Sequence, residues 1–371
     1  MPGKVFISRQ SLLHNLQNLQ QHNLSTGIIP VLKANSYGHD AHLILSILKT
    51  KNLDYVAFAH VNEALSIKKN YPLPILILGA NQPQEVIESL QNHFTASLSS
   101  KEDLLALDAA KFDLPEKTKI HIKFNIGMNR AGISAQHAQD FFIELKKILN
   151  TCPHIELEAV YSHLTSSEIY QHPATEQQIA LFNSLVDQTQ KIFEKNIKTH
   201  LFNSGAFIHY PKSQYTWARV GIALYGIYDH DSFLPKIDLK PVLSWQAPII
   251  NFHRIEAGEG VSYNQTFIAQ KSTNIATVGI GYGDGYKRIG SHGKFSMLYQ
   301  GKLRKVVGRI CMDMTMIDLE DDPVKIGDSV WLLGKEGKTE IAANDLAKAA
   351  QTNAYEILCS LTARNVWTLG V

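Results

Sequence analysis

The chain has 371 residues, of which 44% are hydrophobic and 19% charged, and this predicts two domains or one large barrel with an appendage. A formal net charge of +2 argues against extended nucleic-acid binding as the main function. No stretch approaches the roughly 18 apolar residues of a membrane helix, and the first residues lack the apolar core of a signal peptide. The three cysteines are far apart, so we expect no metal site, no disulfides and a reducing cytoplasm.

Short apolar runs alternate with helix-like segments through the first 228 residues. The first helix is expected from Ser8 to Gln21, where Leu12, Leu16 and Leu19 recur at helical spacing. Eight runs have the character of strands, at residues 27–33, 54–59, 74–78, 94–98, 119–125, 155–162, 199–203 and 217–220. Strands that alternate with helices in this number predict an α/β fold, specifically a (β/α)8 barrel of the TIM type.

The sequence changes character after Tyr228. Residues 229–242 are rich in polar residues and proline and are typical of a connector. Strand-like runs follow at 242–250, 274–281, 304–310, 314–319 and 328–334, separated by glycine and polar turns, and one helix is expected near 342–351. We therefore predict a barrel domain at 1–228 and a mainly β domain at 229–371.

Reactive residues collect at the predicted C-terminal ends of the barrel strands, where enzymes of this fold carry their sites. These positions hold Lys33, His60, Gly79, Ser97, Lys123, Arg130, His163, Asn203, Ser204, Arg219 and Gly221. Lys33 ends the first run beside small residues, where desolvation would lower its pKa and favour Schiff-base chemistry, although a lone lysine is more often an ordinary surface residue.

The tips of the seventh and eighth strands indicate a phosphate site. The Ser204 hydroxyl and the backbone amides of Gly221 and Ile222 could hold an anion there, although Asn-Ser-Gly could equally be a simple helix cap. In the fifth run Lys123 and Asn125 share the face opposite the apolar one, so we expect both to point into the barrel. The alternative is that Lys123 is a solvated edge residue.

The β domain contains the dense segments GVSYNQTF, GIGYGDGYKR and GRICMDMTMID. The glycines of GIGYGDG lack the spacing and the flanking helix of a dinucleotide-binding motif. Tyr263 could act as an acid or base if a nearby cation lowered its pKa. Taken alone, Tyr263 and Met312 are more often packing residues.

Several of these segments together resemble the alanine racemases, pyridoxal-phosphate enzymes that pair a (β/α)8 barrel with a β domain. VLKANSYGHD resembles the family's most specific motif, and the family's order continues with NIGMNRAGI, YSHL, HLFNSGA, RVGIALYG, VSYNQTF, GIGYGDGYKR, GRICMDM and NAYEILC. The resemblance covers nearly the whole chain. It implies interconversion of L-alanine and D-alanine, supply of D-alanine for peptidoglycan, and a head-to-tail homodimer.

The resemblance also implies a role for each matching residue. Lys33 would carry pyridoxal phosphate as a Schiff base and exchange the substrate's α-proton, with Tyr263 as the acid–base group on the opposite face. The cofactor phosphate would be held by Tyr37, Ser204, Gly221, Ile222 and Tyr355. Arg219 would face the pyridine nitrogen, with His163 and Asn203 near the cofactor. Arg130 and the backbone of Met312 would bind the substrate carboxylate, and the partner chain would supply Tyr263 and Met312.

Two points depart from the family or stay open. Asn125 stands where the family commonly has an aspartate, and some members carry a carbamylated lysine at the position of Lys123, which would brace Arg130. The alternatives are a racemase of broader specificity for serine, lysine or arginine, a decarboxylase of the same fold, and a non-catalytic cofactor carrier. The domain after residue 228, with Tyr263 in place, argues against the carrier.

Overall fold

The first helix begins where its capping residue predicts. In this computed structural model, which describes residues 3–79, 82–228 and 237–370, the Ser8 hydroxyl accepts a hydrogen bond from the amide of Ser11 at 3.1 Å. Helix α1 (Arg9–His22) follows and buries Leu12, Leu16 and Leu19, which confirms the helical spacing of those residues.

All eight barrel strands predicted from the sequence are present. They are β2 (Gly27–Pro30), β3 (Val56–Phe58), β4 (Ile75–Ile77), β5 (Thr95–Leu98), β6 (Thr118–Asn125), β8 (Ile155–Tyr161), β9 (Lys198–His200) and β10 (Trp217–Val220). Strands β3 to β9 form one parallel sheet, and β10 pairs in parallel with β2. A bridge from Val31 to Ala57 joins β2 to β3, and the amide of Arg219 donates to the carbonyl of Phe202 at 2.8 Å beside β9. These contacts complete the ring of the TIM-like barrel.

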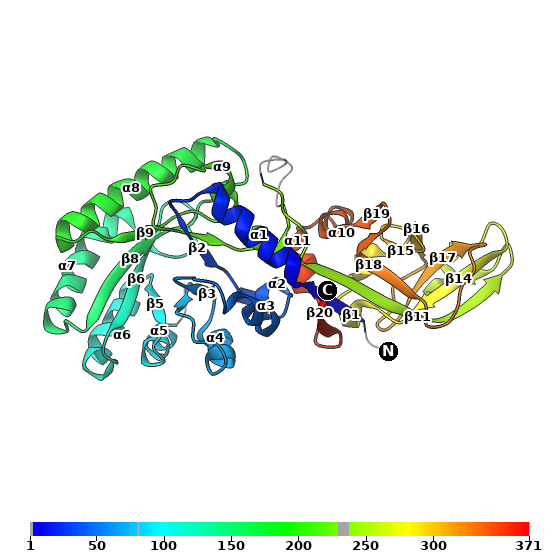
Figure 1. Ribbon diagram of the computed structural model, residues 1–371, viewed down its shortest axis with the longest axis horizontal. Coiled ribbons are helices and arrows are strands. Elements are labelled where there is room, and N and C mark those ends of the chain that lie inside the picture. The colour runs from blue at the N-terminus through cyan, green and yellow to red at the C-terminus, as the bar shows by residue number, and fades with distance from the viewer. Residues whose placement is uncertain (1–2, 80–81, 229–236, 371) are drawn as a thin grey trace.

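Helices cover the outside of this ring, as seen on the left of Figure 1. They are α3 (Ala41–Leu48), α4 (Val61–Lys68), α5 (Pro83–Gln91), α6 (Lys101–Ala110), α7 (Ala135–Thr151), α8 (Pro173–Phe193) and α9 (Ser204–His209). The sequence analysis missed two short elements, the turn α2 (Lys33–Tyr37) and the two-residue strand β7 (Ile133–Ser134). The strand expected at 27–33 ends at Pro30 because Lys33 already starts α2.

The second domain is a closed antiparallel barrel. Its ring runs through β11 (Leu243–Ile255), β14 (Thr273–Val278), β17 (Thr315–Glu320), β16 (Lys302–Val307), β15 (Ser296–Tyr299) and β18 (Ser329–Glu336), which pairs again with β11. Each of the five strand-like runs predicted from the sequence overlaps a strand, and the predicted helix is present as α10 (Ala343–Ala350). Smaller elements are β12 (Gly260–Val261), β13 (Phe267–Ile268), β19 (Thr339–Ile341) and α11 (Ala354–Cys359). Residues 229–236 of the expected connector lie outside the described residues.

The N-terminal strand does not follow the expected division of the chain at residue 228. Strand β1 (Lys4–Ser8) lies in the sheet of the β domain, antiparallel to β11 and parallel to the last strand β20 (Val366–Gly370). Figure 1 accordingly shows both chain ends near the junction of the two domains. Pairing between strands so distant in sequence leaves no local pattern, and periodicity cannot reveal it.

Gly38 joins the two domains at this junction. It has φ +79°, and a Cβ atom there would lie 2.1 Å from the carbonyl oxygen of Leu358 on α11. The carbonyl of Gly38 also accepts a hydrogen bond from the indole of Trp367 on β20 at 2.9 Å. The left-handed backbone and the close approach to α11 both require glycine at this position.

We expect Gly38→Ala to lower the free energy of unfolding by about 2–5 kcal/mol, because it adds left-handed strain to a steric clash. Gly301→Ala is the matched control, since Gly301 has φ +75° but would place its Cβ in open space. That control should lose only about 1–2 kcal/mol. Urea unfolding of the two variants tests this, and equal losses would show that the contact with Leu358 is not close.

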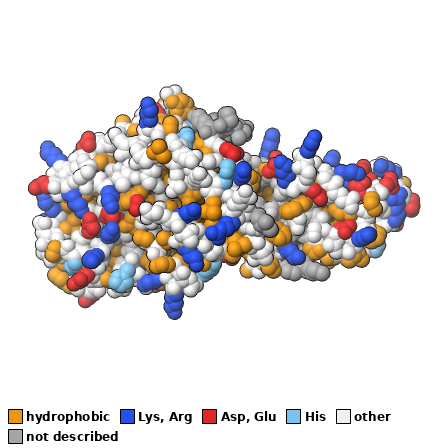
Figure 2. Space-filling model, viewed as in Figure 1, with side chains coloured by type: hydrophobic (Ala, Val, Ile, Leu, Met, Phe, Trp, Pro, Cys, Tyr) orange, Lys and Arg blue, Asp and Glu red, His pale blue; other side chains and the backbone are white. Residues whose placement is uncertain are grey.

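Charged side chains of both signs are mixed on the described surface. On the face in Figure 2, Lys and Arg side chains are interspersed with Asp and Glu side chains over both domains. Among the described residues, no helix has the length and apolar character needed to cross a membrane. In the same part of the chain, no group of three or more His, Cys, Asp or Glu side chains is arranged to bind a metal ion.

Candidate active site

A left-handed turn follows Lys33 at the end of the first barrel strand. Ala34, Asn35, Ser36 and Tyr37 have φ values of 52°, 51°, 57° and 53°. Four consecutive residues in this region are rare, because each non-glycine residue there costs about 1–2 kcal/mol. Strain of this kind persists only where the surrounding structure imposes it, and it clusters at active sites.

Glu63 on α4 holds this turn in place. One carboxylate oxygen accepts a hydrogen bond from the amide of Ala34 at 2.6 Å, and the other accepts from the amides of Ala59 and His60 at 3.0 and 3.2 Å. On the far side, the Asn35 side chain accepts from the amide of Ala41 at 2.8 Å. The strained segment is therefore tied to α4, to the residues that follow β3 and to α3, and this sets the position of Lys33.

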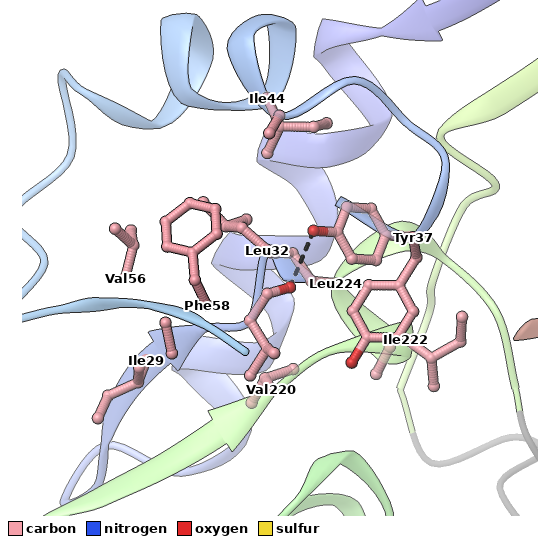
Figure 3. Packing of buried hydrophobic residues seen from close by; sticks show 14 of the residues in the cluster. Ile29, Leu32, Tyr37, Ile44, Val56, Phe58, Val220, Ile222 and Leu224 are labelled. Atoms are coloured by element: carbon pink, nitrogen blue, oxygen red, sulfur yellow. Dashed lines mark hydrogen bonds between the residues drawn. The ribbon is translucent and has the colours of Figure 1, made fainter. Parts of the chain in front are cut away.

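Lys33 opens onto a cavity of about 410 Å³ at the C-terminal ends of the barrel strands. Every barrel residue that the sequence predicted for the cofactor or substrate lines it, as does one β-domain residue, Tyr355: Lys33, Tyr37, Lys123, Arg130, His163, Asn203, Ser204, Arg219, Gly221, Ile222 and Tyr355. Figure 3 shows Tyr37 and Ile222 lying close to each other within a cluster of buried apolar residues. The roles of these residues stay predictions.

One end of the cavity offers neutral hydrogen-bond donors. The Ser204 hydroxyl accepts hydrogen bonds from the amides of Gly221 and Ala223 at 3.1 and 3.4 Å. A Cβ atom on Gly221 would lie 2.5 Å from the hydroxyl of Tyr37, so only glycine lets this hydroxyl reach the backbone. The ring of Tyr355 lies 5.7 Å from that of Tyr37. Hydroxyls and amides that converge in this way suit a phosphate group.

The rest of the cavity is basic. Lys33, Lys123, Arg130 and Arg219 line it, while Glu168 is the one carboxylate among the described lining residues. Although Lys33 faces the open cavity, burial among the surrounding side chains lowers its pKa, and the charge of Arg130 lowers it further. A lower pKa leaves more of the amine neutral, which is the form that attacks a carbonyl carbon.

Lys123 points into the barrel, as its position on the strand predicted. It is 8% exposed, its Nζ donates to the carbonyl of Leu78 at 3.4 Å, and it lies 5.8 Å from the centre of the Tyr161 ring. Burial, followed by the charges of Arg130, Arg219 and Lys33, lowers the pKa of Lys123 to about 8. The reading of Lys123 as a solvated edge residue is therefore wrong.

Arg219 is 4% exposed and has no carboxylate partner among the described residues. Its guanidinium donates to the carbonyls of Ser162, His200 and Leu201 and to ring nitrogens of His163 and His200. Burial lowers the pKa of Arg219 to about 10, so the side chain remains charged at neutral pH. Burial and then the charge of Arg219 hold the pKa of His163 well below its ordinary value.

Arg130 stands at the cavity mouth, and no hydrogen bond or ion pair to it is found among the described residues. Asn125, the last residue of β6, does not brace Arg130. The side-chain oxygen Oδ1 of Asn125 accepts from the backbone amides of Gly127 and Asn129 at 3.1 and 3.0 Å, and its side-chain Nδ2 donates to Oδ1 of Asn129 at 3.0 Å. Asn125 thus shapes the turn and leaves the Arg130 side chain without a partner from this turn.

Four predicted residues lie away from this cavity. Tyr263 and Met312 are 68% and 53% exposed and do not line it. His60 is exposed at the start of α4, and Ser97 is buried, where its hydroxyl donates to the carbonyl of Ile77 at 2.6 Å. The Ser97 side chain therefore forms a hydrogen bond inside the barrel, although the residue was predicted to lie at a strand tip.

Two residues of the site were missed by sequence reasoning. Tyr161 lies between two cations, with its ring 5.1 Å from the Arg219 guanidinium, and donates to the Ser97 hydroxyl at 2.7 Å. Its place in the YSHL segment, immediately before the predicted strand tip, was the available signal. Glu63 left no such signal, because its partner Ala34 belongs to another element.

A parallel barrel with a lysine at its first strand tip, converging hydroxyl and amide groups at its last strands and an attached β barrel is typical of the class of enzymes that hold a phosphate-bearing cofactor through a lysine. Comparison with known families places the chain within that class. The models for the N-terminal and C-terminal domains of alanine racemase match residues 7–229 and 242–368. The chain therefore belongs to the alanine racemase family.

Individual relatives agree with this assignment. The alanine racemase of Nostoc sp. is 35% identical over 368 residues, covering 97% of this chain and 94% of the relative. The crystal structure of alanine racemase from D-cycloserine-producing Streptomyces lavendulae matches with a TM-score of 0.94 at 25% identity, covering 100% and 98% of the two chains. That of Bartonella henselae, which has covalently bound pyridoxal phosphate, matches with a TM-score of 0.87 at 26% identity, covering 99% and 100%.

Proposed function

We propose that this chain is a pyridoxal-phosphate-dependent racemase that interconverts L-alanine and D-alanine. The observation that carries the proposal is one cavity that combines Lys33, with its lowered pKa, and a cluster of hydroxyl and amide groups suited to phosphate at the ends of β9 and β10, the latter paired with β2. Membership of the alanine racemase family supports both the cofactor and the substrate.

The residues present fit pyridoxal phosphate. Tyr37, Ser204, Tyr355 and the backbone of Gly221 and Ile222 would hold its phosphate, since these groups converge where a Cβ on Gly221 would collide with Tyr37. Lys33 would bind it covalently, and His163 and Asn203 would line its sides. Arg219 would face the pyridine nitrogen. Because an arginine keeps its proton, the facing nitrogen would accept a hydrogen bond and stay unprotonated.

Racemisation requires an acid–base group on each face of the substrate's α-carbon. Bound pyridoxal phosphate supplies an electron sink for the negative charge that develops there. The Lys33 amine would exchange the proton on one face and the Tyr263 phenol on the other. Arg130 would hold the substrate carboxylate and so orient the Cα–H bond toward these groups.

We propose that a second copy of the chain supplies Tyr263 and Met312, in a head-to-tail homodimer. Both side chains are exposed and neither lines the cavity of its own chain. Ser262 and Asn264 flank Tyr263 with φ values of 70° and 61°, so a constrained turn presents the phenol outward from the β domain. The β domain, at residues 229–371, would thus complete the partner's site.

We also propose that Lys123 carries a carbamate that braces Arg130. Carbamylation needs a neutral amine, and with a pKa of about 8 roughly one Lys123 side chain in ten is neutral near pH 7. The negative carbamate would offset the cluster of cations around it, a role that Asn125 does not fill.

The carbamate has a direct test. With ¹³C-bicarbonate, the wild-type chain should show a carbamate carbon signal by NMR, and Lys123→Met should not. Lys123→Met should also raise the KM for alanine roughly tenfold, equivalent to about 1.4 kcal/mol, because Arg130 loses its brace. The absence of a ¹³C carbamate signal from the folded wild-type chain under bicarbonate would contradict the proposal.

The activity itself is tested by incubating the protein with L-alanine and pyridoxal phosphate in heavy water. We expect D-alanine to appear, with deuterium at the α-carbon of both enantiomers. Parallel incubations with serine, lysine and arginine determine whether the specificity is broader. Release of carbon dioxide from a diamino acid, without deuterated D-alanine, would instead indicate a decarboxylase.

We further propose that the D-alanine serves peptidoglycan synthesis and that the enzyme works in the cytoplasm. Cys152, Cys311 and Cys359 are all free thiols, as is usual in a reducing compartment. Expression of the chain in a bacterium that lacks its own racemases should restore growth without added D-alanine. Active protein that fails to restore growth would contradict this role.

A further inference from the structure

A chain of hydrogen bonds crosses the barrel interior and ends at Arg219. On β6, His121 Nε2 lies 3.0 Å from a carboxylate oxygen of Glu158 on β8. His121 Nδ1 lies 3.0 Å from Nε2 of His200 on β9, and His200 Nδ1 lies 3.1 Å from Nη1 of Arg219 on β10. Both imidazoles are fully buried, and Glu158 is 4% exposed. We call these four residues the barrel relay.

The two ends of the barrel relay determine which nitrogens carry protons. Arginine has only N–H donors, so His200 must accept at Nδ1 and keep its proton at Nε2. The Nε2–H of His200 donates to His121 Nδ1, so His121 carries its own ring proton at Nε2, which faces the Glu158 carboxylate. A carboxylate only accepts, so both ends demand the same direction and each imidazole is a single neutral tautomer.

Glu158 is held as a carboxylate at the other end. Lys119 and Lys198 donate to one of its oxygens at 2.7 and 3.1 Å, and the Tyr55 hydroxyl donates to the other at 2.5 Å. Burial alone would raise the pKa of Glu158, but the hydrogen bonds from His121, Lys119 and Tyr55 lower it well below its usual range. Burial likewise lowers the pKa of His121 and His200, which agrees with neutral imidazoles.

We propose that Glu158, His121 and His200 are positioning residues, which hold the Arg219 guanidinium at the cavity wall in the orientation that a cofactor nitrogen meets. The other acceptors around the Arg219 guanidinium are backbone carbonyls and the His163 ring, which are neutral. Among the described residues, only the barrel relay connects Arg219 by hydrogen bonds to a carboxylate. Polarised neutral links transmit part of that charge and restrict rotation of the guanidinium. The assignment of the cofactor nitrogen rests on the proposed function, but the proton order in the relay does not.

The proton order is tested in the wild-type protein without cofactor. In ¹⁵N-histidine NMR, with His121 and His200 assigned by single replacements, we expect both rings to be Nε2–H tautomers throughout neutral pH. An Nδ1–H tautomer or an imidazolium at either position would overturn the proposal. The decisive spectrum is that of the native chain, and the single replacements serve only to assign its two signals.

The positioning role is tested with Glu158→Gln, which keeps the shape and removes the charge. We expect kcat for alanine racemisation to fall roughly tenfold or more, the size of effect that residues orienting a metal ligand have, with the KM for alanine nearly unchanged. The ¹⁵N signal of labelled cofactor's ring nitrogen should also shift. Glu158→Asp, which restores the charge, should recover part of kcat.

Tyr55→Phe is the matched control, because it removes a hydrogen bond to the same carboxylate and leaves the barrel relay intact. Its kcat should stay within about twofold of wild type. Equal effects of Tyr55→Phe and Glu158→Gln on kcat and on the ring-nitrogen signal would overturn the positioning role. A wild-type chain that binds no pyridoxal phosphate would refute the proposed function instead, and leave the proton order as measured.

Discussion

Lys33→Ala should abolish both alanine racemisation and covalent attachment of pyridoxal phosphate. The replacement removes the amine that binds the cofactor and one of the two acid–base groups at the α-carbon, so kcat should fall at least about 10³-fold. Borohydride reduction of the wild-type protein should add the mass of the cofactor to the peptide that contains Lys33. The variant should gain no such mass and should form no D-alanine.

The appropriate control is another lysine that serves no site. Lys51 is exposed and does not line the cavity, so Lys51→Ala should keep the wild-type rate and the labelled Lys33 peptide. Labelling of Lys123 in place of Lys33 would show that the other lysine of the cavity carries the cofactor, which would contradict the proposed role of Lys33.

Tyr263→Phe should slow racemisation roughly 10²–10⁴-fold while leaving cofactor attachment intact, because only one acid–base group is lost. The family resemblance assigns Tyr263 to the L face, so removal of the α-proton from L-alanine should be impaired more than removal from D-alanine. Exchange of α-deuterium from each enantiomer, measured separately, gives the two rates. Equal losses for the two enantiomers would contradict the assignment.

A mixing experiment tests whether Tyr263 acts in the partner's site. Lys33→Ala and Tyr263→Phe dimers are each inactive, but subunit exchange creates mixed dimers in which one site has both native residues. Random exchange of equal amounts should therefore restore about a quarter of the wild-type activity. Sites built within a single chain would show no recovery. Lys33→Ala mixed with a Lys33→Ala/Tyr263→Phe double variant is the control that should stay inactive.

Local signals in the sequence were sufficient for most of the fold. Apolar runs located all eight barrel strands, Ser8 marked the start of α1, and the change in character after Tyr228 located the β domain. These features depend on side chains close together in the chain, whose periodicity is visible in one dimension. The pairing of β1 with β11 and β20 was not visible, because it joins residues from opposite ends of the chain.

The barrel strand tips and the ordered family motifs in the sequence named many of the residues that line the cavity at Lys33, Tyr355 of the β domain among them, but they did not name Tyr161. The tertiary structure decided how those residues work together. The strained turn after Lys33, its clamp by Glu63 and the relay from Glu158 to Arg219 all depend on contacts between separate elements. Such contacts form only when the barrel closes and brings strands that are distant in sequence to hydrogen-bonding distance. A local sequence pattern therefore cannot predict them.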